Sequence, residues 1–488
     1  MSPQESQRQA DRPGTAGSPA DAEMLLERQR AAFIAEGAVT ARIRLDRLAR
    51  ALDLLVSHQQ RFCDAIAEDY GQRPPAVTLL MDVYPAVQAI RHAQRNLRRW
   101  MQPRHVSTGL PLGVPGTRSE ILHQPLGVVG IISPWNFPVA LSFGPLAAAL
   151  AAGNRCLIKP SEVTPATTAL MQELISRQFD PSELAVVSGG PEVAESFSRL
   201  PFDHLMFTGS TAVGRKVMQA AAQHLVPVTL ELGGKCPVIV GRSAELDRAV
   251  DRILLGKLAN AGQVCLAPDH VFVPRTMLEP FVRAAQSWVA RAYPAWATNQ
   301  DYTSLISSRH AARARELVAD AVAQGGRVVE LQESRPPTRD ERRFAPTLVL
   351  DPTESMRILQ EEIFAPILPV LTYERIEEPL LAIGRRPRPL ALYYFGNDQV
   401  ELGQILGRTV SGAVTVNDIA AHFMVQNLPF GGVGASGMGA YHGEQGFRQF
   451  SHARAIFRQT RLDLAGLTGL RPPYGPRVRR VLGLLLRR

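Results

Sequence analysis

The chain has 488 residues, too many for one hydrophobic core, so we expect two or three domains. Hydrophobic residues make up 45% and charged residues 20%, and the basic side chains behind the net charge of +9 are interleaved with acidic ones, which argues against a nucleic-acid-binding stripe. The cysteines, Cys63, Cys156, Cys236 and Cys265, are too few and too far apart for a disulfide scaffold or a zinc site, so we expect no metal and a reducing, cytoplasmic location.

The chain begins with a polar stretch. Residues 1–22 have no apolar segment of the kind that a secretory signal needs, and we expect them to be a disordered lead-in. From Glu23 to Arg99, apolar residues recur at three- and four-residue steps, which predicts helices. The Gly- and Pro-rich stretch STGLPLGVPGT (107–117) predicts a hairpin or a linker. No apolar run reaches 18 residues, so the sequence predicts no membrane span.

The pattern changes at GVVGIISP (127–134), a short apolar and β-branched run typical of a buried parallel strand. Strand-like and helix-like segments then alternate as far as PVTLEL. A second alternating block runs from CPVIV (236–240) to about residue 416. This alternation predicts an α/β protein with two doubly wound domains.

Polar residues follow several of the predicted strands, at the edge where open α/β sheets bind ligands. LIKPSE carries Lys159 and Glu162, which read equally well as a ribose-binding pair or as a charged turn. FTGSTAVG carries Gly209, Ser210 and Gly214 between a strand and a helix. Such a turn offers backbone N–H groups to a phosphate, although it could also be an ordinary capped helix start.

Three further motifs hold residues that suit catalysis. Asn136 in ISPWNFP lies between two prolines that would hold its amide rigidly, although it could simply bond its own turn. Glu231 in LELGGK has apolar neighbours, which would raise its pKa and suit a base, unless it is a surface residue. Cys265 in LANAGQVCLAPDH could be a nucleophile, a ligand or a core residue.

Two more motifs, EEIFAP (361–366) and the glycine-rich PFGGVGASGMGAYHGEQGF (429–447), complete a set. The set resembles the aldehyde dehydrogenase superfamily over about residues 23–460, and most of all its class 3 and coniferyl-aldehyde-dehydrogenase branch. The separation of Glu231 from Cys265 also fits that family. The resemblance implies NAD- or NADP-dependent oxidation of an aldehyde to a carboxylic acid.

The resemblance also implies roles. Cys265 would be the nucleophile, and the Asn136 amide with the Cys265 backbone N–H would stabilise the oxyanion. Glu231 would activate the water that hydrolyses the thioester. The residues implied in cofactor binding are Lys159 and Glu162 at the adenosine ribose, Gly209, Ser210 and Gly214 near the pyrophosphate, Trp135 in the same cleft, Glu362 at the nicotinamide ribose, and Phe364 near the ring.

For the domains, the resemblance implies an NAD(P)-binding domain of residues 23–106 and 126–233 and a catalytic domain of residues 234–447. Residues 107–125 and 448–460 would form a small β bridging element, which implies a homodimer. The basic tail, residues 461–488, could dock on the partner subunit, which we favour, or lie on a membrane surface as an amphipathic helix.

Some positions depart from the family pattern and leave the substrate open between aromatic, coniferyl-type aldehydes and medium- or long-chain aliphatic ones. Ala365 stands where Gly is usual and could crowd the nicotinamide. His270 stands where this branch tends to have Tyr, and IAAHFMVQN (419–427) is unlike its usual counterpart near the substrate entrance. Two alternatives are an enzyme that passes the acyl group to coenzyme A, which generally lacks the base present here as Glu231, and a non-catalytic scaffold of the same fold.

Overall fold

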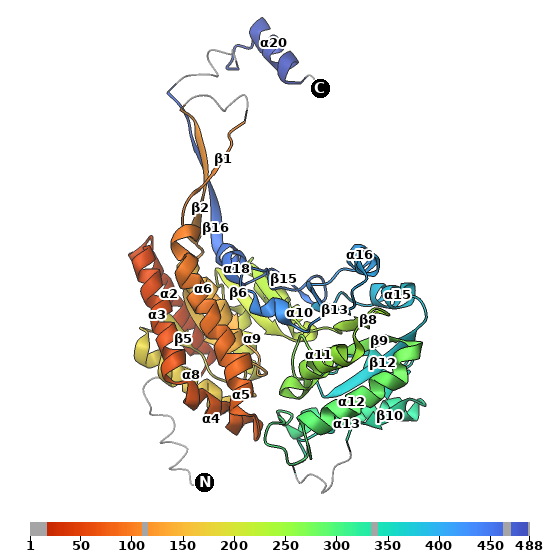
Figure 1. The fold of residues 1–488 in the computed structure, drawn as a ribbon. Helices are drawn as coiled ribbons and strands as arrows, with labels where there is room; N and C mark the ends of the chain where they lie inside the picture. Colours follow the sequence, from red (N-terminus) through yellow and green to blue (C-terminus); the bar gives the residue numbers. More distant parts are fainter. Residues whose placement is uncertain (1–16, 110–115, 333–339, 462–469, 487–488) are drawn as a thin grey trace, which may run out of the picture.

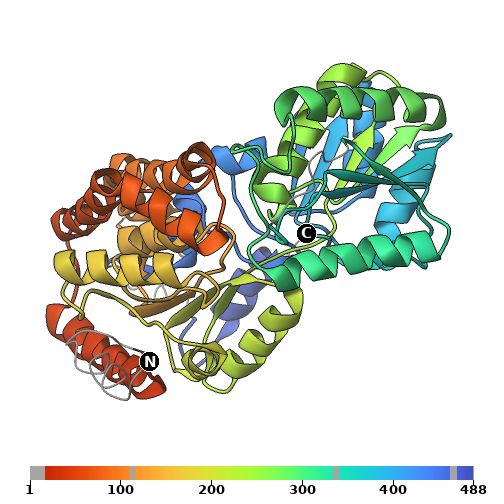
Figure 2. The ribbon, with the colours of Figure 1, turned by 90° about the horizontal axis from the view of Figure 1, so that it is seen from below.

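A computed structural model describes residues 17–109, 116–332, 340–461 and 470–486 (Figure 1). Two α/β domains lie side by side (Figure 2), and a narrow three-stranded sheet projects from them. This arrangement confirms the predicted α/β fold class. Within the described ranges, no helix combines the length and apolar character needed to cross a membrane.

The chain begins with helices that pack on the first domain. They are α2 (Pro19–Glu36), α3 (Ala41–Ser57), α4 (Gln59–Tyr70), α5 (Pro75–Thr78), the π-helical turn η1 (Leu79–Val83) and α6 (Tyr84–Trp100). Helix α2 starts at Pro19, inside the stretch predicted to be disordered, so that prediction is wrong for residues 19–22. The reason is a capping box, in which Ser18 accepts a hydrogen bond from the Asp21 backbone and Asp21 accepts one from the Ser18 backbone. Residues 1–16 lie outside the described ranges.

The first sheet has the strand order β15-β7-β6-β3-β4-β5 and is parallel except for β15. Its strands are β3 (Val128–Ile132), β4 (Arg155–Lys159), β5 (Leu184–Val186), β6 (His204–Gly209), β7 (Val228–Leu232) and β15 (Gly437–Met438). The connecting helices are α7 (Ala140–Ala152), α8 (Pro165–Gln178), α9 (Pro191–Arg199) and α10 (Thr211–Ala222). Every residue of β3 and β4 is buried, as their continuous apolar runs predict.

The second sheet has the order β10-β11-β12-β9-β8-β13-β14 and is parallel except for β10. Its strands are β8 (Pro237–Val240), β9 (His270–Pro274), β10 (Arg327–Glu330), β11 (Thr347–Leu350), β12 (Ile367–Tyr373), β13 (Ala391–Phe395) and β14 (Ala413–Val416). Its helices are α11 (Leu246–Leu258), η2 (Ala259–Gly262), η3 (Arg275–Met277), α12 (Leu278–Ala292), α13 (Ser308–Ala323), α14 (Arg357–Gln360), α15 (Glu377–Arg385), α16 (Gln399–Arg408) and α17 (Ala421–Met424).

The end of the chain returns to the first domain. Strand β15 pairs with β7, and α18 (Gly443–Gln449) packs on α6 and α7. These segments therefore differ from the predicted catalytic domain, which placed everything up to residue 447 with the second sheet. Strand pairing across the chain, which local sequence does not encode, decides this boundary.

The projecting sheet consists of β1 (Arg104–Val106), β2 (Arg118–Pro125) and β16 (Ser451–Arg458), all antiparallel (Figure 1). Both segments expected to form a bridging element supply strands to it, but β1 lies wholly before residue 107, in the segment expected to belong to the NAD(P)-binding domain. Strand β16 is mostly exposed. Helix α20 (Pro476–Leu485) lies beyond the tip of this sheet (Figure 1).

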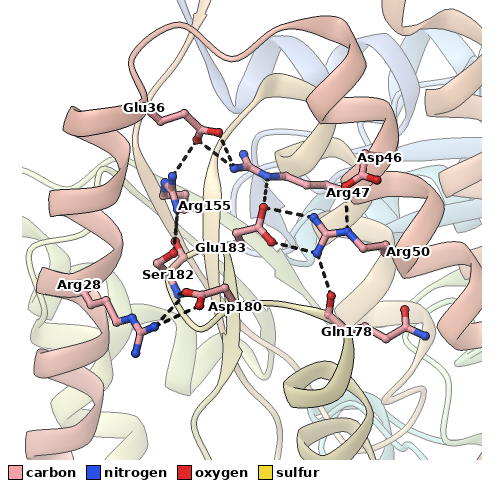
Figure 3. A network of polar contacts seen from close by, with 10 residues as sticks. All are labelled: Arg28, Glu36, Asp46, Arg47, Arg50, Arg155, Gln178, Asp180, Ser182 and Glu183. Atoms are coloured by element: carbon pink, nitrogen blue, oxygen red, sulfur yellow. Dashed lines mark hydrogen bonds and ion pairs between the residues drawn. The ribbon is translucent and has the colours of Figure 1, made fainter.

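An ion-pair network fastens helices α2 and α3 to the first sheet (Figure 3). The nearly fully buried Arg47 bonds Glu36 and Glu183, each at 2.9 Å. Glu183 also accepts from Arg50, and Glu36 accepts from Arg155 of β4 at 2.7 Å. Because these charges share partners, the network holds the N-terminal helices against the edge formed by β4 and β5.

Candidate active site

Two cavities meet where the two α/β domains face each other. The larger, of about 400 Å³, is lined by Pro134, Trp135, Asn136, Leu141, Thr208, Gly209, Ser210, Glu231, Leu232, Gly233, Cys265, His310, Arg313, Glu362, Phe364, Leu390 and Phe430. The second, of about 350 Å³, is lined by Leu80, Met81, Pro85, Phe137, Ala140, Leu141, Val264, Cys265, Leu266, Asp418, Ile419, Ala420, Ala421, Phe423, Met424 and Phe430. Cys265 lines both cavities, so one thiol faces two different compartments.

The loop that carries Cys265 is tightly shaped. Asn260 and Ala261 have φ of 48° and 52°, in the left-handed region, and Gly262 follows at 76°. A Cβ on Gly262 would lie 2.4 Å from the Ala365 carbonyl oxygen, so only glycine allows this close approach. The buried Gln263 side chain braces the loop, because it donates to the Asn260 carbonyl at 2.9 Å and accepts from the Ile306 backbone at 2.8 Å.

The electrostatics of the site oppose ionisation of the thiol. Burial raises the pKa of Cys265 to about 12, and the nearby carboxyl groups of Glu362 and Glu231 add to the rise. A thiol in this setting stays protonated near neutral pH until a positive charge or a base is brought close to it.

Glu231, which the sequence predicts to be the base, lies near the C-terminal end of β7. Its side chain is buried, and neither carboxyl oxygen has a hydrogen-bond partner among the described residues. Burial raises its pKa well above 4.5. A carboxyl group that is unpaired, desolvated and on the wall of a cavity can accept a proton near neutral pH.

Asn136 lies on the loop after β3 and is buried on the wall of the larger cavity. Its Nδ2 donates to the Gln263 carbonyl at 3.2 Å, which fixes the plane of the amide and leaves the second N–H available. The cavity therefore brings Cys265, Glu231 and Asn136 together from three separate segments of the chain.

Glu362 and Phe364 line the larger cavity from the opposite domain. A Cβ on Gly233 would lie 2.1 Å from Glu362 Oε2, so the glycine makes room for this carboxyl group. Burial raises the pKa of Glu362 to about 7, although a hydrogen bond from the Gly234 backbone favours the ionised form and partly opposes the rise. Phe364 has φ of 52° and meets Trp135 edge-on at 5.5 Å between ring centroids.

Other predicted cofactor residues are placed differently. Gly209 and Ser210 line the cavity, but Gly214 does not. A Cβ on Gly214 would lie 2.6 Å from Leu232 Cδ2, so this glycine allows α10 to pack on β7, and its place near the pyrophosphate stays a prediction. Lys159 and Glu162 line neither cavity. The buried Lys159 donates to the Pro160 carbonyl at 2.7 Å and lies 4.0 Å from Glu162.

The residues that depart from the family pattern also have definite places. His270 is buried outside both cavities, where Nε2 accepts from Arg386 at 2.8 Å. Ala365 is buried in an apolar cluster with Ile363 and does not line the cavity. The segment that begins at Ile419 does form one wall of the second cavity.

Sequence reasoning missed His310 and Arg313, which line the larger cavity from α13. Arg313 donates to the Glu362 carbonyl at 2.7 Å, and the His310 ring meets Trp135 edge-on at 5.0 Å. Their segment reads only as an amphipathic helix, so no local signal marked them. In the part of the chain that the structure describes, no three His, Cys, Asp or Glu side chains are grouped to hold a metal ion.

Comparisons with known proteins agree with this geometry. The profile of the Aldehyde dehydrogenase family matches residues 2–456. The chain is 49% identical to the probable coniferyl aldehyde dehydrogenase of Caulobacter vibrioides, over 94% of this chain and 95% of that protein. It is 47% identical to the coniferyl aldehyde dehydrogenase of a Pseudomonas species, over 97% of this chain and 98% of that protein.

Solved structures are similar as well. The substrate-bound AldH of Staphylococcus aureus has a TM-score of 0.88 at 35% identity and covers 95% of this chain and 99% of its own. The Mycobacterium tuberculosis aldehyde dehydrogenase complexed with NAD+ has a TM-score of 0.81 at 27% identity, covering 92% of each chain.

Proposed function

The chain belongs to the aldehyde dehydrogenase family, and from that premise we propose that its substrates are coniferyl-type aromatic aldehydes and that Cys265 is its nucleophile. NAD(P)-dependent oxidation of an aldehyde is its reaction. The observation that carries the proposal is the position of Cys265. It faces Glu231 and Asn136 in one cavity and a mostly apolar compartment in the other.

In the first half of the reaction, the Cys265 thiolate adds to the carbonyl carbon of the aldehyde. The new oxyanion accepts hydrogen bonds from the free N–H of Asn136 Nδ2 and from the Cys265 backbone N–H. When the dinucleotide is bound, its nicotinamide supplies the acceptor for the hydride that leaves the substrate carbon. Loss of hydride converts the thiohemiacetal on Cys265 into a thioester.

In the second half, Glu231 takes a proton from water, and the resulting hydroxide attacks the thioester carbon. Attack releases the carboxylic acid and returns the Cys265 thiolate. Burial raises the pKa of Glu231 well above its usual value, which makes its carboxylate a stronger base toward water and suits this step.

The larger cavity suits a dinucleotide, NAD or NADP. Glu362 offers a carboxyl group to ribose hydroxyls, Phe364 and Trp135 offer a ring surface, and Gly209 with Ser210 presents the start of α10 to the pyrophosphate. Lys159 and Glu162 would meet the adenosine ribose farther along the same edge of the first sheet. We propose accordingly that residues 23–106 and 126–233, without β1 and with β15 and α18 added, form the NAD(P)-binding domain, and that the second sheet belongs to the catalytic domain.

The second cavity supports an aromatic substrate. Its wall is apolar and aromatic apart from Asp418, and its volume of about 350 Å³ lies in the range of small-molecule sites. Relatives that share almost half of this sequence over nearly its whole length are named for coniferyl aldehyde. Straight-chain aldehydes would fill the same space with fewer contacts.

A comparison of kcat/KM tests the proposal. We expect coniferaldehyde and cinnamaldehyde to be oxidised at least tenfold more efficiently than hexanal or decanal, with either cofactor, and Cys265→Ala to form no NADH. A preference for the straight-chain aldehydes would contradict the substrate, and a steady rate in Cys265→Ala would contradict the nucleophile. Acceleration by coenzyme A would favour acyl transfer, and an inactive native enzyme would favour a scaffold.

We also propose a homodimer that forms through the projecting sheet. Phe457 and Val106 leave 48% and 37% of their surface exposed there, and strand edges of this kind pair readily. The tail would follow the sheet to the partner, where exposed Leu482 and Leu484 of α20 would dock. Sedimentation with anionic liposomes tests the membrane alternative, since only that reading predicts pelleting that depends on residues 471–488. The four free cysteines suit a reducing cytoplasm.

A further inference from the structure

Arg73 and Asp82 form an ion pair that is fully buried, with 0% of either side chain exposed and 3.4 Å between the charged atoms. Neither residue lines either of the two cavities that share Cys265. The Arg73 guanidinium lies 5.1 Å from the ring centroids of both Tyr70 and Phe137. Burying two charges is costly unless further hydrogen bonds satisfy them, so the partners of this pair indicate what it does.

Those partners lie on one short segment, the loop that carries Asn136. Arg73 donates to the Asn136 carbonyl oxygen at 2.9 Å. Asp82 accepts from the Ala140 backbone N–H at 2.6 Å, and a hydrogen bond from Val139 also reaches it. The ion pair is therefore hydrogen-bonded to both ends of the loop, at Asn136 and at Ala140.

The same carbonyl oxygen has further donors. Tyr70 donates to the Asn136 carbonyl at 3.2 Å, and Asn260 Nδ2 donates to it at 3.3 Å. Asn260 also donates to the Gln263 carbonyl at 3.2 Å. This oxygen also accepts the hydrogen bond from the Asn136 amide. Three side chains thus converge on one carbonyl and join it to the loop of Cys265.

Asp82 occupies η1, a π-helical turn between α5 and α6. Such turns widen a helix and often occur at functional sites. Its neighbours Leu80 and Met81 line the apolar cavity. One turn of helix therefore supplies both a wall of the substrate compartment and an anchor for the loop of Asn136.

We propose that Arg73 and Asp82 are positioning residues that hold the Asn136 amide at the place where the oxyanion forms. This inference rests on the proposed role of Asn136. An oxyanion donor stabilises the transition state only where its N–H already points at the developing charge, so a small displacement of the loop weakens it. The pair acts, through Asn136, on the addition of the thiolate to the aldehyde and not on cofactor binding.

The test is a double-mutant cycle on the full-length enzyme. We expect Arg73→Met to lower kcat roughly 10- to 100-fold with little change in KM for NAD+, because it loosens one donor without touching the cofactor wall. Asn136→Ala should lower kcat by about 100-fold or more. In the Asn136→Ala background, Arg73→Met should then have almost no further effect on kcat.

Rates are normalised to the folded fraction of each variant, measured by circular dichroism, so that unfolded protein does not count. If Arg73→Met does not fold, Tyr70→Phe takes its place, since it removes one donor to the same carbonyl at almost constant volume. The matched control is Arg44→Met. Arg44 is also buried and donates to the Val39 and Ala151 carbonyls, away from both cavities, so we expect lower stability and unchanged kcat.

A purely structural pair would lower the melting temperature and leave kcat per active site unchanged, as in the control, and that result would overturn the inference. Independent, multiplicative losses in the double variant would overturn it as well. The proposed function fails differently. It fails if the native enzyme oxidises no aldehyde, or if Asn136→Ala keeps the native kcat.

Discussion

Lys235 and Asp269 form an ion pair, almost completely buried, that joins the motif of Glu231, the proposed base, to the motif of Cys265, the proposed nucleophile. Lys235 follows Glu231 by a few residues in LELGGK. Asp269 follows Cys265 by a few residues in LANAGQVCLAPDH. The two motifs come from different parts of the chain, at the boundary between the two sheets. Their ion pair fixes the base and the nucleophile relative to each other.

The same pair also reaches the loop of Glu362. Lys235 Nζ donates to the carbonyl oxygens of Ile358 and Glu361 at 2.8 and 2.7 Å. Asp269 Oδ2 accepts from the Ile363 backbone at 3.0 Å. These bonds lie on both sides of Glu362, so the pair sets the position of a carboxyl group that we assign to the cofactor.

Asp269→Asn should therefore weaken cofactor binding. The amide can still accept from Ile363, but Lys235 is left as an uncompensated buried charge, which costs about 3–5 kcal/mol of stability. We expect the KM for NAD+ to rise roughly tenfold and the urea midpoint to fall, with a smaller change in the KM for the aldehyde. Initial rates over a range of NAD+ concentrations measure this, and an unchanged KM for NAD+ would separate the pair from the cofactor.

His270→Gln should leave aldehyde selectivity unchanged. His270 lines neither cavity, and burial lowers its pKa to about 4, so it is neutral at working pH and accepts from Arg386. Glutamine can accept the same hydrogen bond. We expect the ratio of kcat/KM between coniferaldehyde and hexanal to stay within about twofold of the native ratio. A reversed ranking would show that His270 acts on the substrate compartment.

Glu231→Gln should stall the enzyme after the first hydride transfer. Stopped-flow absorbance should show one NADH per active site, followed by a steady rate reduced roughly 100-fold or more. In the native enzyme the base works only when ionised, so kcat should fall as the pH falls through the raised pKa of Glu231. An acidic limb near pH 4.5 would contradict this assignment.

Cys265 should be alkylated slowly by iodoacetamide in the free enzyme. Its pKa of about 12 leaves little thiolate near neutral pH, so the rate should rise roughly tenfold per pH unit. Bound NAD+ should accelerate the reaction, because the positive charge of its nicotinamide lowers the pKa of a nearby thiol. Mass spectrometry locates the label, and Cys265→Ala is the control. Labelling of the buried Cys156 in preference would contradict the expectation.

His204 should make the native fold sensitive to acid. Burial lowers its pKa from 6.5 to about 4, so the unfolded chain binds a proton that the folded chain refuses between those values. Stability from this group is complete above pH 6.5 and is lost as the pH falls toward 4, by at most roughly 3 kcal/mol. The side chain of His204→Gln can still bond Thr229. The variant should be less stable than the native protein at neutral pH, and the difference should shrink as the pH falls toward 4, because only the native protein loses stability there. A constant difference between their urea midpoints would exclude this linkage.

The sequence by itself determined the features that depend on local pattern. Continuous apolar runs such as those of β3 and β4 distinguish the buried strands from the amphipathic helices. A strand that is buried on both faces has no regularly spaced polar residues, whereas an amphipathic helix does. The capping signal at Ser18 and Asp21 was also present in the sequence, and helix α2 starts there. The motifs singled out Cys265, Glu231 and Asn136 as a set because their order and separations resemble those of one enzyme family.

Only the tertiary structure decided which of these side chains meet and what holds them. Arg73 and Tyr70 reach the Asn136 carbonyl, and Lys235 reaches the Glu362 loop, through contacts between segments far apart in the chain. Spacing in the sequence does not encode such contacts, because they follow from the order of strands in each sheet and from the packing of one domain on the other. For the same reason, the sequence did not show that Gly214 allows α10 to pack on β7. It also did not show that His270 accepts a hydrogen bond from Arg386 outside both cavities.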